Sequence, residues 1–155
     1  MVNFAKRVEK FSDNHLKPGE KIMSAVFMQQ RGSLSSAALR ASLGLIGLLL
    51  SHFMAKKAEP KLNNTASNLS RMLPDRTMII AVTDKRILVY KHKELGASVE
   101  SFACEYKLGD IVDVQTQFRL LMSVVTLQFK DGGSVSLEAG LGQNFKEFTK
   151  YACNR

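Results

Sequence analysis

The stretch VVTLQFKDGGSVSLEAG, residues 124–140, decides the fold class. Apolar and polar residues alternate on both sides of its central Asp-Gly-Gly, and a period of two is typical of half-buried β-strands. The Asp-Gly-Gly supplies residues that tolerate the backbone conformations of a tight reversal. The stretch therefore predicts an antiparallel hairpin whose apolar residues share one face. These residues are Val125, Leu127, Phe129, Val135, Leu137 and Ala139.

Further strand signals lie upstream of this hairpin. Residues 22–30 alternate in the same way and predict a first strand. Residues 78–82 and 86–91 are rich in β-branched residues and flank the turn 83–85 closely enough for a second tight hairpin. Together these segments predict a mostly antiparallel β-sheet.

Between the two hairpins the alternation is less regular. Residues 99–108 predict a strand whose even-numbered positions from Phe102 share one face, with Val99 out of phase as a bulge would produce. Residues 112–118 predict a half-buried strand in which Val112, Val114, Thr116 and Phe118 face one way. We therefore expect the aromatic residues of the strands to point inward.

Both ends of the chain show helical periodicity. Residues 1–16 predict an amphipathic helix that packs on the sheet. Residues 142–153 predict a C-terminal helix, and Asn144 followed by Glu147 suits an N-cap. The apolar residues at helical spacing are Phe4, Val8 and Phe11 at one end and Leu141, Phe145, Phe148 and Ala152 at the other.

Residues 33–76 differ in character from the strands and predict an insert between the first two. Residues 41–55 carry no formal charge and are leucine-rich, and a polar tract, 61–70, follows. As a helix the apolar run would extend about 22 Å, against about 30 Å for a bilayer core, which disfavours a transmembrane span. The run must still be buried, against its own sheet, in a partner or second copy, or in a membrane interface.

Apolar runs of this length are more often packed against protein than interfacial, which favours the first two alternatives. The candidate apolar contacts are Leu45, Ile46, Leu48, Leu49 and Phe53. The candidate contacts with an anionic surface are Arg40, Lys56, Lys57, Lys61, Lys85 and Arg86. Lys85 and Arg86 lie at a predicted turn, where charged residues usually serve only as solvated groups.

Composition indicates one globular domain, 1–155, of ordinary hydrophobic content. Most of the net charge of +8 lies in the N-terminal half, where residues 1–76 hold 12 Lys and Arg against 5 Asp and Glu. This excess would attract an anionic surface. Cys104 and Cys153 lie far apart in a chain without a secretory signal pattern, so we expect reduced thiols and a cytoplasmic location.

Motifs of catalysis and cofactor binding are not found in the sequence. The histidines at 15, 52 and 92 are dispersed, there is no Cys-x-x-Cys, and the glycines occur at predicted turns. We therefore predict no enzyme activity, no cofactor and no metal. Nucleic-acid binding is disfavoured because basic residues are not interleaved with exposed aromatic residues.

Three segments resemble the bacterial pleckstrin-homology-like domains, relatives of the GRAM domain: LKPGEKI at 16–22, AVTDKRILVY at 81–90 and LGDIVDV at 108–114. The resemblance covers most of 16–152. It implies an α+β fold in which a strongly bent antiparallel β-sandwich or open barrel is closed by the C-terminal helix, here with a helical insert after the first strand. It also implies that the connection between the first two strands, occupied by the insert, often approaches a membrane.

No phosphoinositide-binding signature can be carried over from that family, and the fold hosts lipid-binding, peptide-binding and scaffolding members. We therefore predict a non-catalytic binding or scaffolding module that acts through a protein partner or self-association. The alternative is a peripheral domain that attaches to anionic lipid at the inner face of the cell membrane through residues 40–57. An enzyme without a recognisable motif is the third and least favoured reading.

Overall fold

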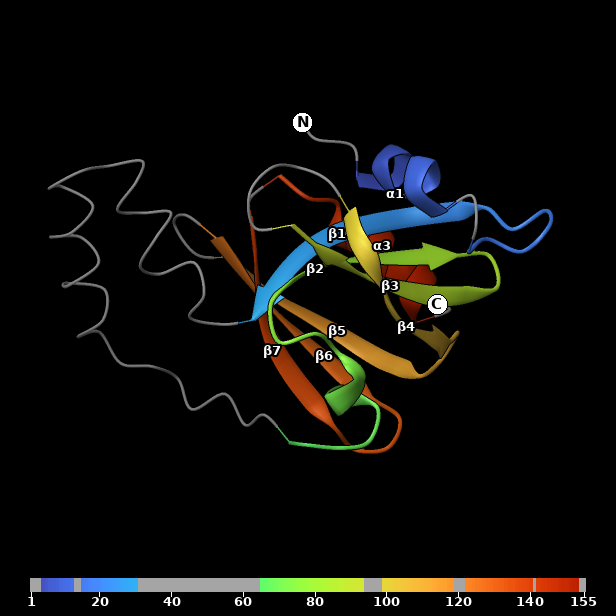
Figure 1. Ribbon diagram of the computed structural model, residues 1–155. Helices are drawn as coiled ribbons and strands as arrows, with labels where there is room; N and C mark the ends of the chain where they lie inside the picture. The colour runs from blue at the N-terminus through green and yellow to red at the C-terminus, as the bar shows by residue number, and fades with distance from the viewer. Residues whose placement is uncertain are drawn as a thin grey trace, which may run out of the picture.

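The computed structural model describes residues 4–12, 15–30, 65–93, 99–118, 122–140 and 142–153 (Figure 1). Within these ranges a seven-stranded sheet is accompanied by two α-helices and one short 3₁₀ helix. The elements are α1 (Phe4–Ser12), β1 (Ile22–Gln30), η1 (Ser70–Met72), β2 (Thr77–Thr83), β3 (Arg86–His92), β4 (Val99–Lys107), β5 (Ile111–Phe118), β6 (Met122–Phe129), β7 (Ser134–Gly140) and α3 (Phe145–Ala152).

The strands form one antiparallel sheet in the order β4-β3-β2-β1-β7-β6-β5. β1 belongs to both halves of it: it pairs with β2 along nearly its whole length but with β7 only at Gln29 and Gln30. The sheet therefore bends at β1 and stays open between β4 and β5. This arrangement confirms the predicted pleckstrin-homology-like α+β fold.

The main core lies between the two halves of the bent sheet. Alternate residues of the two hairpins point into it, including Val125, Leu127 and Leu137, all completely buried. The helix α3 adds Phe145, Phe148 and Ala152 to the same cluster. Asn144 caps this helix, because its side chain accepts a hydrogen bond from the Glu147 amide at 3.2 Å. The N-cap predicted from the sequence is thus confirmed.

A second apolar cluster lies on the outer face of the β1–β4 half. The helix α1 lies there, on the opposite side of the sheet from α3, and inserts Val8 against β2 and β3 (Figure 1). β2 is consequently buried on both faces: Ile80 points into the main core while Ile79 and Ala81 point toward α1. An amphipathic helix covering an apolar sheet face explains why a surface-facing row of this sheet is apolar.

The predicted phase of β4 is wrong at Phe102. Val89 pairs with Cys104 and Tyr90 with Phe102, so one residue, Ala103, is unmatched and forms a bulge. The bulge turns Phe102 to the outer cluster with Val99, whereas Cys104 faces the main core. Period-two counting across the bulge therefore assigned Phe102 to the wrong face.

The predicted half-buried face of β5 is also wrong at both ends of the strand. Ile111 pairs with Phe129 and Asp113 with Gln128, so Val112 is bulged and is 41% exposed. Phe118 is 76% exposed although Val114 on the same row is buried. The aromatic residues of the strands do not all point inward, because β5 extends beyond the core at its last residue.

The described part of the predicted insert, 65–76, packs against the second hairpin. The Ser134 amide donates to the Thr65 carbonyl at 2.9 Å, and the Asp131 carboxylate accepts from the Leu69 amide at 3.0 Å. Only η1 is helical in this part of the chain. Residues 31–64, with the rest of the predicted insert, lie outside the described residues.

Candidate functional site

The turn between β2 and β3 holds two of the predicted site residues, Lys85 and Arg86. The Arg86 guanidinium forms a two-pronged ion pair with Glu20, with Nε and Nη2 each 3.0 Å from a carboxylate oxygen. Its Nη1 contacts the Glu105 carboxylate on β4, and Nη2 donates to the His15 carbonyl at 2.6 Å. Arg86 therefore ties β3 both to β4 and to the segment that precedes β1.

Glu20 is a buried carboxylate whose side chain has no exposed surface. Burial by itself raises the pKa of Glu20, but hydrogen bonds from Arg86, the Lys17 amide and the Thr83 hydroxyl outweigh it and lower the pKa to about 2. The Lys17 and Thr83 bonds measure 2.8 and 2.7 Å. At neutral pH the Glu20 carboxylate is therefore ionised and fully hydrogen-bonded. This is expected of a structural ion pair and not of a group that transfers protons.

The remaining residues of the turn complete this network. Asp84 and Lys21 hydrogen-bond reciprocally, since the Lys21 amide donates to Asp84 Oδ1 at 2.9 Å and the Asp84 amide donates to the Lys21 carbonyl at 3.1 Å. Lys85 Nζ donates to the Pro18 carbonyl at 3.2 Å and is exposed. We call this network of 15–21, 83–86 and Glu105 the clamp. Contact of Lys85 and Arg86 with an anionic surface stays a prediction.

The other predicted site residues lie in the undescribed range 31–64. They are Arg40, Leu45, Ile46, Leu48, Leu49, Phe53, Lys56, Lys57 and Lys61. The structure therefore does not bring them together with the clamp or separate them from it.

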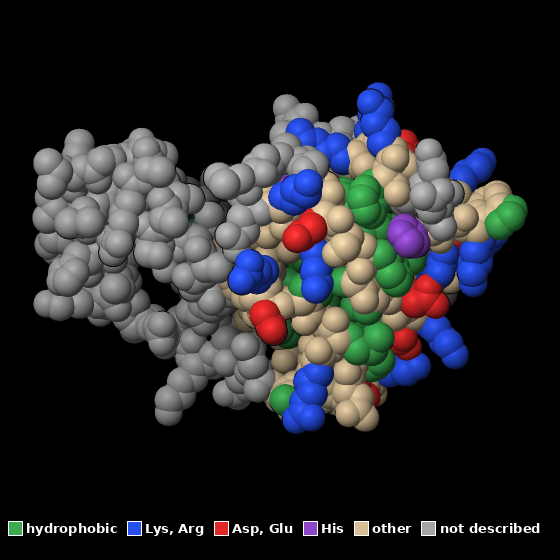
Figure 2. All heavy atoms as spheres, viewed as in Figure 1, with side chains coloured by type: hydrophobic (Ala, Val, Ile, Leu, Met, Phe, Trp, Pro, Cys, Tyr) green, Lys and Arg blue, Asp and Glu red, His purple; other side chains and the backbone are tan. Residues whose placement is uncertain are grey.

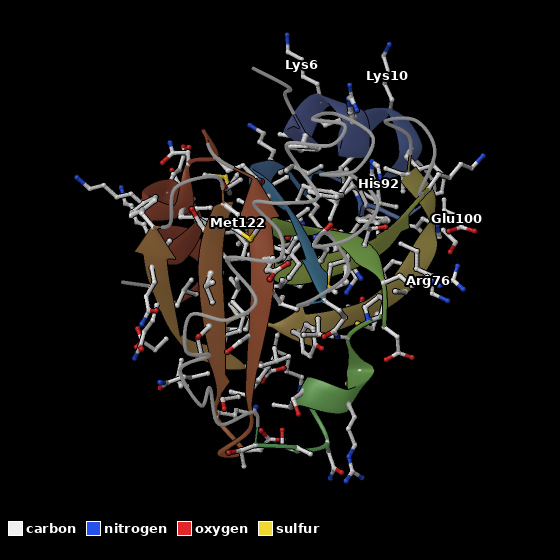
Figure 3. The ribbon with its side chains drawn as sticks, turned by 90° about the vertical axis from the view of Figure 1, so that its left-hand side faces the viewer. Lys6, Lys10, Arg76, His92, Glu100 and Met122 are labelled. Atoms are coloured by element: carbon white, nitrogen blue, oxygen red, sulfur yellow. The ribbon has the colours of Figure 1, made fainter. Side chains whose placement is uncertain are left out.

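A hollow of about 240 Å³ lies where β2 begins, β3 ends and β4 begins. Figure 3 labels three of the residues that line it, Arg76, His92 and Glu100. Burial lowers the pKa of His92, and the charge of Arg7 adds to the effect. The hollow thus combines two basic and two acidic groups, which selects for neither sign of ligand. It is lined by Pro74, Asp75, Arg76, Thr77, Lys91, His92 and Glu100.

The charged surface of the described part is mixed. Figure 2 shows Lys and Arg side chains spread over the visible face, with Asp and Glu among them. Lys6 and Lys10 project away from the sheet on the exposed side of α1 (Figure 3). This distribution forms no concentrated anion site on that face.

The edge of β5 presents apolar side chains to solvent. In the described part of the chain, β5 pairs with β6 on one side and with no strand on the other. Val112 and Phe118 are two of the four large apolar residues in this part that are clearly exposed. We call β5 from Val112 to Phe118 the β5 edge, and it is the strongest candidate for an interaction surface.

The sequence pattern did not predict this exposed surface. Period-two alternation predicts the face on which a side chain lies, but not whether its strand is at the margin of the sheet or how far it extends past the core. One signal was available in 112–118. Its apolar residues are few, because polar residues, mainly glutamine and threonine, separate Val114 from Phe118. That pattern is compatible with an edge but does not require one.

No group of three or more His, Cys, Asp or Glu side chains in the described ranges could hold a metal ion. None of the helices in those ranges is long and apolar enough to cross a membrane. A family model described as "Bacterial PH domain" matches residues 16–153, a range that leaves α1 outside. No curated protein and no solved structure matches the chain.

Proposed function

This chain belongs to the bacterial PH domain family, and we propose that it is a non-catalytic binding or scaffolding module that acts through protein contact, with self-association as its principal mode. Domains of this kind are generally non-catalytic binding modules. The proposed setting is the cytoplasm. Cys104 and Cys153 are not joined in a disulfide, which is consistent with that setting.

The β5 edge is the observation that carries this proposal. A strand that ends a sheet offers unpaired backbone donors and acceptors, which favour pairing with another chain. β5 also carries Phe118 and Val112, whose apolar surface stays in contact with water unless a partner covers it. Backbone pairing and apolar burial are both contributions that a protein contact would supply.

The charged groups of the domain give less support to a small-molecule or headgroup site. Arg86, the most enclosed cation of the clamp, already faces Glu20 and Glu105. The hollow carries Asp75 and Glu100 beside its basic residues, and these carboxylates would repel an anionic headgroup. A protein surface with mixed polar side chains suits such a region better.

Peripheral attachment to anionic membrane at the inner face of the cell is the second candidate. It is supported by the exposed Lys6 and Lys10 on α1 and by the basic residues that flank the apolar run of the insert. This binding would be driven by charge, and it would therefore weaken with salt. Self-association through apolar and backbone contacts would depend on protein concentration and persist in salt.

The test is sedimentation velocity of the whole chain from about 1 to 200 µM, a range suited to a small interface, at low and high salt. It is accompanied by co-sedimentation with neutral and anionic liposomes. We expect the sedimentation coefficient to rise with concentration at both salt levels and the protein to stay in the liposome supernatant.

A monomer at every concentration would refute self-association. Pelleting only with anionic lipid would favour the membrane alternative instead. The double variants Leu45→Ser/Leu49→Ser and Lys56→Glu/Lys57→Glu then separate the apolar from the charged contribution of the insert, because each removes one and keeps the other.

A further inference from the structure

The outer face of β6 and β7 is buried, although it lies outside both apolar clusters. Val125 and Leu137 point into the main core, so Val124 and Glu138, which pair directly, lie on the opposite face. Val124 is 1% exposed, yet it belongs to neither cluster of the described residues. We call this patch the β7 face; it consists of Gln29, Met122, Val124, Ser136 and Glu138.

The two described α-helices do not account for this burial. α1 packs on β1, β2 and β4, on the outer face of the other half of the sheet, and α3 contributes its apolar residues to the main core. The neighbouring strand does not share the burial, because Gln115 and Gln117 are exposed although Gln117 pairs with Val124. The cover is therefore centred on β6, β7 and the end of β1.

Two polar groups of the β7 face are buried without a hydrogen-bond partner in the described part of the chain. They are Oε2 of Glu138 and Nε2 of Gln29, and the two residues pair directly between β1 and β7. Glu138 is 8% exposed and Gln29 is 3% exposed. Buried polar groups are normally hydrogen-bonded, and a carboxylate removed from water needs a cation or donors beside it. Whatever covers this face must therefore bring a charged or polar group as well as apolar ones.

Residues 31–64 leave and rejoin the described structure beside this face. The residue before them, Gln30, pairs with Leu137 of β7. The residue after them, Thr65, accepts a hydrogen bond at its carbonyl from the Ser134 amide, at the start of the same strand. From Ser134 to Leu137 the strand extends only roughly 10 Å. A segment held at both ends beside a surface meets it at a local concentration of about millimolar order, which favours this contact over one with a separate molecule.

We propose that the β7 face is the docking site of residues 41–55 of the same chain. This run carries no formal charge and is leucine-rich, so it supplies the apolar cover that Val124 requires. It is bounded by Arg40 on one side and by Lys56 and Lys57 on the other. These flanking cations supply the positive charge that the Glu138 carboxylate lacks.

The docking has a consequence for the two candidate functions. It lies within one copy of the chain, so it neither requires nor prevents self-association through the β5 edge. It does oppose membrane attachment, because a run docked on the β7 face is not available to a lipid interface. Attachment through residues 40–57 would first have to expose Val124 and Glu138 to water.

Thiol labelling of the whole chain with a maleimide tests the docking. Val124→Cys should react about a hundredfold or more slowly than Gln117→Cys, its exposed pair partner, at both about 1 and 100 µM protein. Adding Leu45→Ser/Leu49→Ser should speed the labelling at position 124 about tenfold or more, because the polar side chains weaken the apolar cover. The wild-type chain, which holds Cys104 and Cys153, gives the background rate.

The matched control is Ile79→Cys, because Ile79 is buried on the outer face of the other half, in the cluster that contains Val8 of α1. Its labelling should stay slow with the serine substitutions; if it does not, the fold is lost and Glu138→Lys takes their place. That change repels the flanking cations and should also speed the labelling at position 124. Fast labelling of Val124→Cys alone, protection only at high protein concentration, or protection that persists in the folded variants would each overturn the docking. None of these outcomes depends on self-association through the β5 edge.

Discussion

The clamp and the β5 edge lie in different halves of the sheet and satisfy their polar and apolar groups in opposite ways. In the clamp, Glu20 and Arg86 are enclosed and meet each other and several backbone groups. On the β5 edge, Phe118 is exposed and one margin of the strand pairs with no other strand in the described part of the chain, although α3 also contacts β5. The first region has its partners within one copy of the domain, whereas the second exposes apolar side chains to solvent.

This difference distinguishes residues that stabilise the fold from residues that could bind a partner. Most clamp residues belong to the segments 16–22 and 81–90, through which the sequence resembles its family, and their contacts are internal to the domain. Of the β5 edge, only 112–114 belongs to such a segment, and the exposed Phe118 lies outside it. In this domain the most recognisable residues stabilise the fold, and the candidate for binding lies elsewhere.

The largest effect should come from breaking the clamp. Arg86→Ala would leave the buried Glu20 carboxylate without its cation, and we expect a loss of about 3–5 kcal/mol in the free energy of unfolding. Urea denaturation measures this loss. Lys85→Ala is the control at the next residue and should cost less than about 0.5 kcal/mol, because Lys85 is exposed. Equal effects of the two variants would contradict the clamp.

The pH dependence of stability should follow Glu20. Its pKa is about 2 in the folded protein, below the ordinary 4.5, so ionised Glu20 stabilises the fold. The contribution is fully present above about pH 4.5 and is lost as the pH falls toward 2; its size is about 3 kcal/mol. Urea denaturation between pH 7 and 3 should show about 2 kcal/mol of this loss, and Glu20→Gln should flatten it. An unchanged slope in the variant would assign the acid sensitivity to other groups.

A smaller effect should come from the contact between the 65–73 segment and the second hairpin. A Cβ on Gly133 would overlap Oγ of Ser67 and lie 2.5 Å from its Cβ. Gly133→Ala should therefore cost about 1–3 kcal/mol. In a Ser67→Gly background the same substitution should cost clearly less. A double-mutant cycle by urea denaturation measures this coupling. A coupling free energy near zero would show that the 65–73 segment moves aside without loss of stability.

The smallest effect on stability should come from the β5 edge itself. Phe118→Ala removes a side chain that is 76% exposed, and the free energy of unfolding should change by less than about 0.5 kcal/mol. Phe129→Ala on neighbouring β6 is the matched control; it removes a side chain that is 2% exposed and should cost about 3–5 kcal/mol.

The same variant should weaken self-association, as measured by sedimentation velocity. A stable Phe118→Ala that still associates like the wild type would remove Phe118 from the interface. A strongly destabilised one would show that β5 supports the core more than its exposure indicates.

Much of the sheet could be predicted from the sequence because its determinants are local. Alternation, turn residues and the spacing of glycine specify a strand within a few residues, and β1 coincides with the predicted 22–30. The two hairpins and the N-cap at Asn144 follow from contacts between residues close in the chain. The helices are shorter than predicted, α1 ending at Ser12 and α3 beginning at Phe145, because periodicity marks an apolar face rather than a helix end.

Tertiary structure alone decided what those elements do. The bulge at Ala103 reverses the face of Phe102, the ion pair joins Glu20 to Arg86 across 66 positions, and β5 becomes a margin because of the strand order. Each depends on which distant segments meet, and period-two alternation is the same in a central strand and at an edge. The sequence by itself thus determined the strands and the family resemblance, while long-range packing determined which charged residues are internal and which apolar ones face solvent.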